Sequence, residues 1–188
     1  MTGTAILSVF LGMGLATATG FRVFLPLFVM SLGAYLGVIS LNEQWIWLAT
    51  FPALITFSTA MIIEVLAYYI PIVDNFLDSI SLPLTVVVGT LVTVATFHGM
   101  NPVFIYAFGI IGGGGMAAAV KGTSAITRLV TTATTGGLAN SLVSTLETLV
   151  SAVLAFVAIY IPLIAAFLVI LVLFMVFLFY RKVRPRRK

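Results

Sequence analysis

The chain has 188 residues, of which 62% are hydrophobic and only 7% are charged. A chain with so few charged side chains cannot cover a surface that faces water. A soluble globular domain is therefore excluded, and an integral membrane protein is predicted. Cysteine is absent, which excludes disulfides and thiolate metal sites, and the one histidine, His98, cannot form an imidazole cluster alone. We therefore expect no cofactor and no metal.

The formal net charge of +4 is concentrated at the C-terminus. Six of the nine Lys and Arg residues stand in the last eight positions, 181–188, directly after an apolar run. Basic residues next to membrane helices mark the cytoplasmic side, so this basic tail predicts a cytoplasmic C-terminus that touches anionic lipid rather than nucleic acid. The first residues lack the charged start of a cleaved signal peptide, and we expect them in the mature protein.

The first 40 residues predict two helices. Residues 4–19 are apolar but short for a span of about 20 residues, so they either cross at a tilt or dip into the membrane and return. Residues 21–40 are long enough for a complete span. Gly14 lies in the first segment, and Gly20 directly follows it, two residues before Arg22.

The next helix is bounded by aromatic residues at both ends. Trp45 opens it and Tyr69 ends it, which is typical of the two membrane interfaces. An aqueous loop with two acids is predicted over residues 72–81, and a span rich in β-branched residues over residues 82–97.

The central apolar segment, residues 103–120, contains four consecutive glycines at 112–115. Each glycine costs a helix about 1 kcal/mol, which implies an unwound backbone or a very close helix contact. Residues 121–137 carry seven Ser and Thr hydroxyls, so we expect them to be re-entrant or to line a cavity. The last run, 138–180, divides at Pro162 into two helices of about 20 residues, the second purely apolar and facing lipid.

These segments predict an all-α fold, a polytopic membrane helix bundle of about seven spans with re-entrant or glycine-broken elements. Six or eight spans follow if the first segment is re-entrant or if residues 121–137 cross. We expect one transmembrane domain over residues 1–188, in the bacterial inner membrane. With the C-terminus in the cytoplasm and seven spans, the N-terminus lies outside and all nine basic residues lie on the cytoplasmic side.

The two halves of the chain, 1–99 and 100–180, show a weak similarity. A glycine-marked break precedes Arg22 in the first half and Arg128 in the second, and in each half an acid stands six residues after a serine. Repeats with broken helices are typical of transporters whose site lies between the halves, although a bias to small residues produces similar patterns. Five glycines would then form a backbone site: Gly14, Gly20, Gly114, Gly115 and Gly122.

Glu147 is the main candidate for a functional residue. An ionised carboxylate at the bilayer centre costs about 2.5 to 3.5 kcal/mol, so such residues are rare without a partner or a role. Helical spacing places Asn140, Ser144 and Ser151 on the same face as Glu147. This polar face is either a hydrated path with Glu147 as a proton or cation site, or a packing seam in which Glu147 is paired with an arginine.

The other charged residues allow two roles each. Arg22 and Arg128 follow glycine-marked breaks, where backbone N–H groups favour anions, so they either bind a carboxylate or phosphate group or neutralise the acids. Glu64, near the inner end of its helix, is either a coupling acid or an ion-pair partner of Arg22 or Lys121.

Asp74 and Asp78 are spaced as the carboxylates of a Mg²⁺-dependent lipid or prenyl transferase would be on a helix. Such enzymes need a second acidic motif, which the chain lacks, so a helix-capping role is the better interpretation. We expect no catalytic residue and no enzyme.

Several stretches together resemble a known family. The first is the sequence GLATATGFRVFLPLF at 14–28, and the second is Glu64 followed by a turn at 70–78 that contains Pro71 and two aspartates. The others are the pair His98-Gly99 and the stretch before Asn140, which is rich first in glycine and then in threonine and contains Arg128. Over most of its length, up to about Ile159, the chain is similar to the bacterial family of small integral membrane proteins called domain of unknown function 4126. The family name implies no activity and assigns no functional residue.

The preferred function is transport or channelling of a small polar or anionic solute, with proton coupling through Glu147 as an option. The partners expected are the lipid bilayer, a small solute or ion and, as an open alternative, further copies of the chain. The alternative function is a non-transporting subunit or assembly factor that binds partner helices, and the weakest is the Mg²⁺-dependent transferase.

Overall fold

The computed structural model describes residues 3–183, apart from the side chains of residues 3, 4, 71, 72, 74, 75, 78, 79, 182 and 183. Within this range the chain is helical and has no strand, which confirms the predicted all-α class. The elements are α1 (Gly3–Phe21), α2 (Phe24–Tyr35), the 3-10 helix η1 (Glu43–Ala49), α3 (Phe51–Ala67), α4 (Pro71–Thr96), α5 (Pro102–Phe108), the π-helix η2 (Gly109–Gly114), α6 (Gly115–Thr135), α7 (Asn140–Tyr160) and α8 (Pro162–Val183). The helical break predicted at Pro162 is confirmed.

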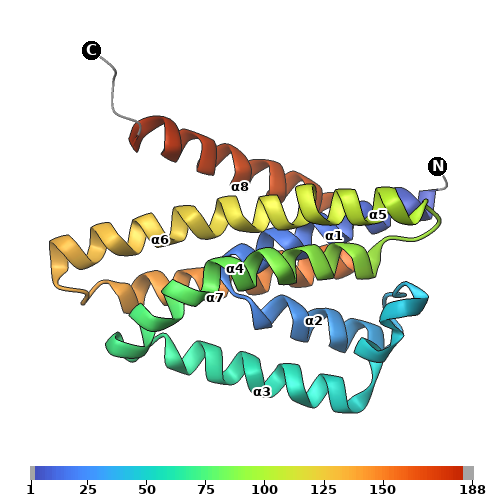
Figure 1. The fold of residues 1–188 in the computed structure, drawn as a ribbon, viewed down its shortest axis with the longest axis horizontal. Coiled ribbons are helices and arrows are strands. Elements are labelled where there is room, and N and C mark those ends of the chain that lie inside the picture. The colour runs from blue at the N-terminus through green and yellow to red at the C-terminus, as the bar shows by residue number, and fades with distance from the viewer. Residues whose placement is uncertain (1–2, 184–188) are drawn as a thin grey trace.

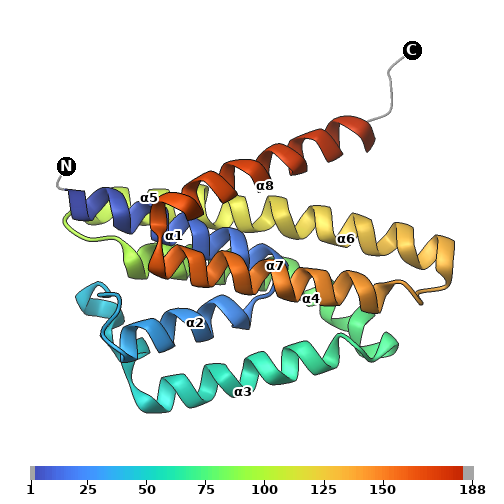
Figure 2. The same ribbon diagram turned by 180° about the vertical axis from the view of Figure 1, so that it is seen from behind.

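Successive helices run back and forth along the long axis of the molecule (Figure 1). The segment η1 and the connection between α4 and α5 lie at the same end as the N-terminus, whereas the turns from α3 to α4 and from α6 to α7 lie at the opposite end. Helix α8 runs toward this opposite end and diverges from the bundle as it does so (Figure 2).

Helix α1 is the central helix and contacts α4, α6, α7 and α8. Its residue Leu15 is completely buried. Small residues let the neighbouring helices approach closely, since a Cβ atom at Gly14 would lie 2.6 Å from the Cβ atom of Ala158 on α7. Gly20 meets Val120 of α6 in the same way. The core is therefore built around α1, which places its C-terminal end, next to Arg22, inside the bundle.

The four consecutive glycines do not unwind the helix, and close contact with α4 explains two of them, Gly113 and Gly114. All four lie in a π-helical turn and the first residue of α6, within one helical stretch from Pro102 to Thr135. A Cβ atom at Gly113 would lie 2.5 Å from the carbonyl oxygen of Gly89 on α4, and one at Gly114 would lie 2.7 Å from Oγ1 of Thr90. Larger side chains at these two positions would push η2 away from α4.

Residues 121–137 are not re-entrant, but the other predicted alternative is confirmed, because Thr123, Ser124 and Thr127 line a cavity. Most of this segment forms α6, which continues the helix from Pro102 and ends at Gly136, where φ is 64°. Several of its hydroxyl groups bind within the helix, as shown by the bonds from Thr123 Oγ1 to the Ala119 carbonyl and from Thr127 Oγ1 to the Thr123 carbonyl, both 3.0 Å. Polar composition therefore did not prevent a long helix here.

The predicted loop over residues 72–81 is also wrong, because these residues form the start of α4. Pro71 occupies the first helical position, where its missing N–H costs nothing, and acidic residues are favourable in the first turns of a helix.

Helix α2 is shorter than the span predicted over 21–40, and Gly37, with φ of 70°, turns the chain after it. The helix predicted from Trp45 is split into η1 and α3, which meet at 67°.

Three helical stretches in the described range are long and apolar enough to cross a membrane: Pro102–Thr135, Asn140–Tyr160 and Pro162–Arg181. The bent pair of η1 and α3 would make a fourth, and three shorter apolar helices accompany them, Ala5–Thr19, Phe24–Tyr35 and Ile80–Thr96. Large apolar side chains on α8 face outward, with Phe167 65% exposed. These helices indicate a membrane protein.

Candidate functional site

Five charged residues predicted as site residues are buried in the interior, where the end of α1 meets α3, α6 and α7. None of their side chains is more than 7% exposed. They are Arg22, Glu64, Lys121, Arg128 and Glu147. Burying charges is costly unless they are paired, so the contacts of each one decide what the cluster can do.

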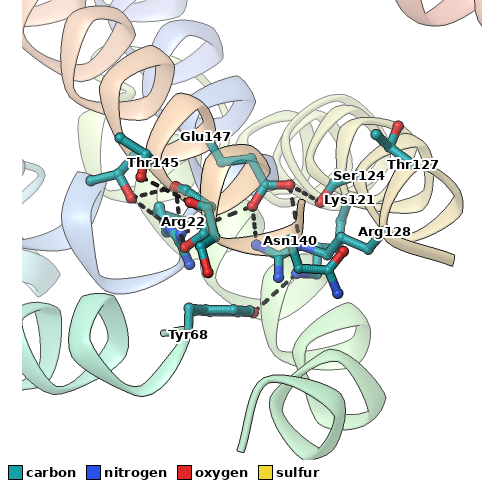
Figure 3. Close-up of polar contacts among 12 residues, drawn as sticks. Arg22, Tyr68, Lys121, Ser124, Thr127, Arg128, Asn140, Thr145 and Glu147 are labelled. Carbon is teal, nitrogen blue, oxygen red and sulfur yellow. Dashed lines mark hydrogen bonds and ion pairs between the residues drawn. The ribbon is translucent and has the colours of Figure 1, made fainter. Parts of the chain in front are cut away.

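Glu147 reaches from α7 to two residues of α6 (Figure 3). Its Oε2 atom lies 2.5 Å from Nη2 of Arg128, and Ser124 donates its hydroxyl to Oε1. Nη2 of Arg22 lies 4.0 Å from Oε2 as well. Ser124 and Arg128 are four residues apart and share one face of α6, so both can serve the same carboxylate. The predicted pairing of Glu147 with an arginine is present, with Arg128 as the closer partner.

Arg22 lies in the break between α1 and α2 and is completely buried. Its Nε donates to Thr148 Oγ1 at 2.9 Å, and its Nη2 donates to the carbonyl and the hydroxyl of Ser144 at 2.7 and 2.5 Å. Its Nη1 has no hydrogen-bond partner among the described residues. Because Nη1 carries two N–H groups, the guanidinium keeps two donors available for another oxygen.

Tyr68, which was not among the predicted site residues, joins the positive charges. Its ring is 3% exposed, with the guanidinium carbons of Arg22 and Arg128 at 4.1 and 4.6 Å from the ring centroid. Nζ of Lys121 lies 5.4 Å from the centroid and donates to the tyrosine hydroxyl at 3.2 Å. The spacing of four residues from Glu64 was the available signal, since it places both side chains on one face of the same helix.

The carboxylate of Glu64 binds backbone N–H groups, and its pairing with Arg22 or Lys121 stays a prediction. Its carboxylate oxygens accept the N–H groups of Val23 and Phe24 at 2.8 and 2.9 Å. These groups are at the start of α2, where the first turn of a helix leaves N–H groups unsatisfied and carries partial positive charge. Glu64 therefore caps α2 and fixes the break that holds Arg22.

The polar face predicted for α7 is confirmed as one buried face. Ser144 binds Arg22, and Ser151 donates to the carbonyl of Ala18 on α1 at 3.0 Å. Asn140 contacts hydroxyl groups on α6, including a bond of 2.9 Å to Thr132. The face therefore packs against α1 and α6, as a seam of small polar residues does.

All five glycines of the predicted backbone site lie inside helices. Gly14, Gly20 and Gly114 instead permit close helix contacts, and a Cβ atom at Gly122 would meet the hydroxyl of Tyr180 on α8. Gly115 has no described atom within 4 Å of such a position.

Asp74 and Asp78 lie in α4, but their side chains are outside the described residues. Among the side chains that are described, no group of three or more His, Asp or Glu residues is placed to hold a metal ion.

Two cavities approach the charged cluster from different sides. A groove of about 670 Å³ between α6, α7 and α8 reaches Ser124 and Glu147. A smaller cavity of about 240 Å³ between α3 and α4 reaches Glu64 and Tyr68. The cluster thus lies between a groove open to the side of the bundle and a cavity behind the ring of Tyr68.

Comparison with curated proteins and with solved structures finds no match. The profile of the family described as Domain of unknown function (DUF4126) matches residues 9–182. This range includes the whole charged cluster and, apart from the first residues of α1, all the helices that build it. The chain therefore belongs to the DUF4126 family, as the resemblance indicated.

Proposed function

We propose that the protein moves a small anionic solute across the bacterial inner membrane and that Arg22 binds the solute. The observation that carries the proposal is the Nη1 atom of Arg22, buried and without a hydrogen-bond partner in the described part of the chain. A buried donor left unsatisfied costs about 1 to 3 kcal/mol, so a bound oxygen or halide at this position would be favourable.

The surroundings of Arg22 support an anion over a cation or a neutral solute. Arg22, Lys121 and Arg128 all lie against the ring of Tyr68. The start of α2 is beside them, and the carboxylate of Glu64 already binds there. A broken helix that presents its N-terminus at mid-membrane is the usual way in which transporters bind an anionic group.

The proposal includes seven crossings with the C-terminus in the cytoplasm. The crossings would be α1, α2, η1 with α3, α4, α5 to α6, α7 and α8, of which the shorter ones would cross with flanking residues. Glu43 and His98 then face outside, and the basic tail faces inside. The two halves of the proposed repeat differ in one respect. In the first half α2 stands between the break at Arg22 and α3, which carries Glu64, whereas in the second half α6, which carries Arg128, is followed directly by α7, which carries Glu147.

Glu147 would control access to the arginines. Its carboxylate holds Arg128 at 2.5 Å and lies 4.0 Å from Arg22, so an incoming anion competes with it for both. Protonation of Glu147 would weaken its hold on Arg128 and favour anion binding, which gives a route to coupling solute and proton movement.

A second candidate function is a non-transporting subunit that binds partner helices. The ion pair of Glu147 with Arg128, completed by the hydroxyl of Ser124, favours it, because a closed buried pair is also what a purely structural role requires. The described residues offer no observation in favour of the Mg²⁺-dependent transferase.

Anion uptake into proteoliposomes tests the proposal. Wild type would be compared with Arg22→Gln and with Glu147→Gln on a panel of chloride, phosphate and small carboxylates, with potassium and a neutral sugar as negative probes. Glu43→Gln, the same change at an exposed acid, is the matched control. We expect wild type and the control to take up at least one anion and Arg22→Gln to take up none. Correctly folded wild type that passes no solute of the panel would favour the subunit.

The coupling role of Glu147 needs a separate comparison. We expect uptake by wild type to respond to an imposed pH gradient and uptake by Glu147→Gln to be insensitive to it. An equal response of both proteins would refute proton coupling through Glu147.

A further inference from the structure

We propose that Thr85 of α4 is a second ligand of the anion that Arg22 binds, so that the hydroxyl and the guanidinium hold one small anion between them. The inference rests on the proposed function, because it assigns a further residue to the same site. Two buried groups without a hydrogen-bond partner among the described residues carry it, Oγ1 of Thr85 and Nη1 of Arg22. Both residues are completely buried.

The hydroxyl of Thr85 differs from those of the other threonines in α4. Thr90, Thr93 and Thr96 each donate to the carbonyl group four residues earlier, at 2.8, 2.9 and 3.0 Å. This is the ordinary way in which a threonine hydroxyl is satisfied inside a helix. Thr85 makes no such bond, so its hydroxyl remains available as a donor. A buried hydroxyl without a partner costs free energy, which a ligand that accepts its hydrogen bond would recover.

The contact between α1 and α4 places Thr85 at the level of Arg22. The two helices run in opposite directions (Figure 1), and a Cβ atom at Gly12 would lie 3.2 Å from the Cα atom of Thr93. From Gly12, Arg22 is ten residues further along the chain, or roughly 15 Å. From Thr93, Thr85 is eight residues back along α4, or roughly 12 Å in the same direction. The two residues therefore lie at nearly the same height in the bundle.

The contact between α4 and α6 leads to the same level. A Cβ atom at Gly89 would lie 2.6 Å from the Cβ atom of Ala117, and α4 and α6 also run in opposite directions (Figure 1). Thr85 stands one helical turn before Gly89. Lys121 stands one helical turn after Ala117, which is the same direction along the bundle. Thr85 is therefore level with Lys121, a member of the charged cluster.

Thr85 also lies on the face of α4 that meets α1. At 100° per residue it is within about 20° of Val92 and Thr96 around the helix, and both of these residues are completely buried. Oγ1 of Thr96 would lie 2.6 Å from a Cβ atom at Gly12 of α1. Because α1 ends at Phe21, Thr85 faces the region directly after this helix, where the chain continues with Arg22.

The two free groups define the class of ligand. Nη1 of Arg22 offers two N–H groups and Thr85 offers one O–H group, so the matching partner is a halide or an oxygen of a small carboxylate or nitrate. The cavity of about 240 Å³ between α3 and α4 is lined by Leu84 and Val23, the sequence neighbours of these two residues. Sites for drug-sized ligands measure about 300 to 1,000 Å³, so this space favours an anion of few atoms.

Thermal stabilisation of the purified full-length chain by anions tests the inference without requiring transport, because a ligand that binds the folded state raises its melting temperature. Wild type, Thr85→Val and Thr85→Ser would be titrated with the sodium salts of chloride, nitrate, formate and phosphate. Arg22→Gln measures the effect of salt that does not arise from the site. Thr96→Val is the matched control, since Thr96 is completely buried on the same face of α4 but its hydroxyl is bonded within the helix.

We expect at least one anion to stabilise wild type and Thr96→Val with the same apparent Kd. Thr85→Val should bind this anion about 10- to 150-fold more weakly, which is the effect of one hydrogen bond to a charged group. Thr85→Ser keeps the hydroxyl and should bind nearly as tightly as wild type.

The possible failures can be told apart. Equal affinities of wild type and Thr85→Val, with binding lost in Arg22→Gln, would refute the role of Thr85 and leave the anion site at Arg22 in place. Wild type that responds to every salt as Arg22→Gln does would refute both. Binding that depends on Thr85, without uptake into proteoliposomes, would support the inference and refute only transport.

Stability without a bound anion gives a second measurement. In sodium gluconate, Thr85→Val should melt at or above the temperature of wild type, because it removes a buried donor that has no partner. Thr96→Val loses a hydrogen bond of 3.0 Å and should melt below wild type. An equal loss in both variants would mean that the hydroxyl of Thr85 has a structural partner, and would overturn its role as a ligand.

Discussion

Removing Glu147 should destabilise the protein strongly, and removing Arg128 at the same time should restore part of the loss. The carboxylate of Glu147 is bound by Arg128 and Ser124 and is 6% exposed. Breaking a buried ion pair by deleting one partner costs about 3 to 5 kcal/mol, because the remaining charge stays buried without the opposite charge that compensated it. Replacing both partners by apolar residues of similar size is often close to neutral.

The corresponding experiment is a double-mutant cycle of Glu147→Leu, Arg128→Met and the combined variant. For a chain of this size about 1 kcal/mol shifts the melting temperature by about 2 to 4 °C, so each single variant should melt about 6 to 20 °C below wild type. Thermal unfolding in detergent, followed by circular dichroism, measures the shift. Glu43→Leu, at an exposed acid, should leave the melting temperature within a few degrees of wild type.

The sign of the coupling decides the interpretation. If the pair behaves as described, the combined variant is less destabilised than the sum of the two single variants, with a coupling energy of about 0.5 to 3 kcal/mol. Strictly additive losses would show that Glu147 and Arg128 act independently, and the assigned ion pair would then be wrong.

Three further predictions concern the surroundings of the pair. Glu64→Ala should cost about 0.5 to 2 kcal/mol in a denaturant titration, because the two N–H groups at the start of α2 lose their cap; no loss would argue against the cap. Gly20→Ala should destabilise the protein by about 1 to 3 kcal/mol, because the added Cβ atom overlaps with α6. Gly115→Ala, where the Cβ atom enters open space, should stabilise the protein by about 1 kcal/mol. Equal melting temperatures of the two variants would contradict the close contact at Gly20. Tyr68→Leu should lower the free energy of unfolding by about 0.5 to 2 kcal/mol for each cation that contacts the ring, whereas Tyr68→Phe should keep most of this stabilisation. Identical melting temperatures of the two variants would show that the aromatic ring does not stabilise the cluster.

Features that depend on one segment alone could be predicted from the sequence. The break at Pro162 follows from the missing N–H and fixed φ of proline, and the polar face of α7 follows from the helical period. The pairing of Glu147 with an arginine was one of two open interpretations, since an acid at this depth requires a partner or a role.

Features that depend on neighbouring helices could not be predicted. Hydropathy averages over all sides of a segment, so residues 121–137 appeared too polar for a long helix although Lys121 and Arg128 face the interior. The capping of α2 by Glu64 joins residues 41 positions apart, and the bond from Arg22 to Thr148 joins residues 126 positions apart. Neither contact has a local signature, because its partner is an ordinary backbone or hydroxyl group.

The concentration dependence of anion uptake by Arg22→Lys tests the central claim most directly. Lysine keeps the positive charge but cannot present two N–H groups from Nη1, and a hydrogen bond to a charged group contributes about 1.5 to 3 kcal/mol. If Arg22 binds the solute, half-saturation should require roughly 10- to 150-fold more anion than in wild type. Half-saturation at the wild-type concentration, in a variant that folds and transports, would contradict the claim that Arg22 contacts the transported anion.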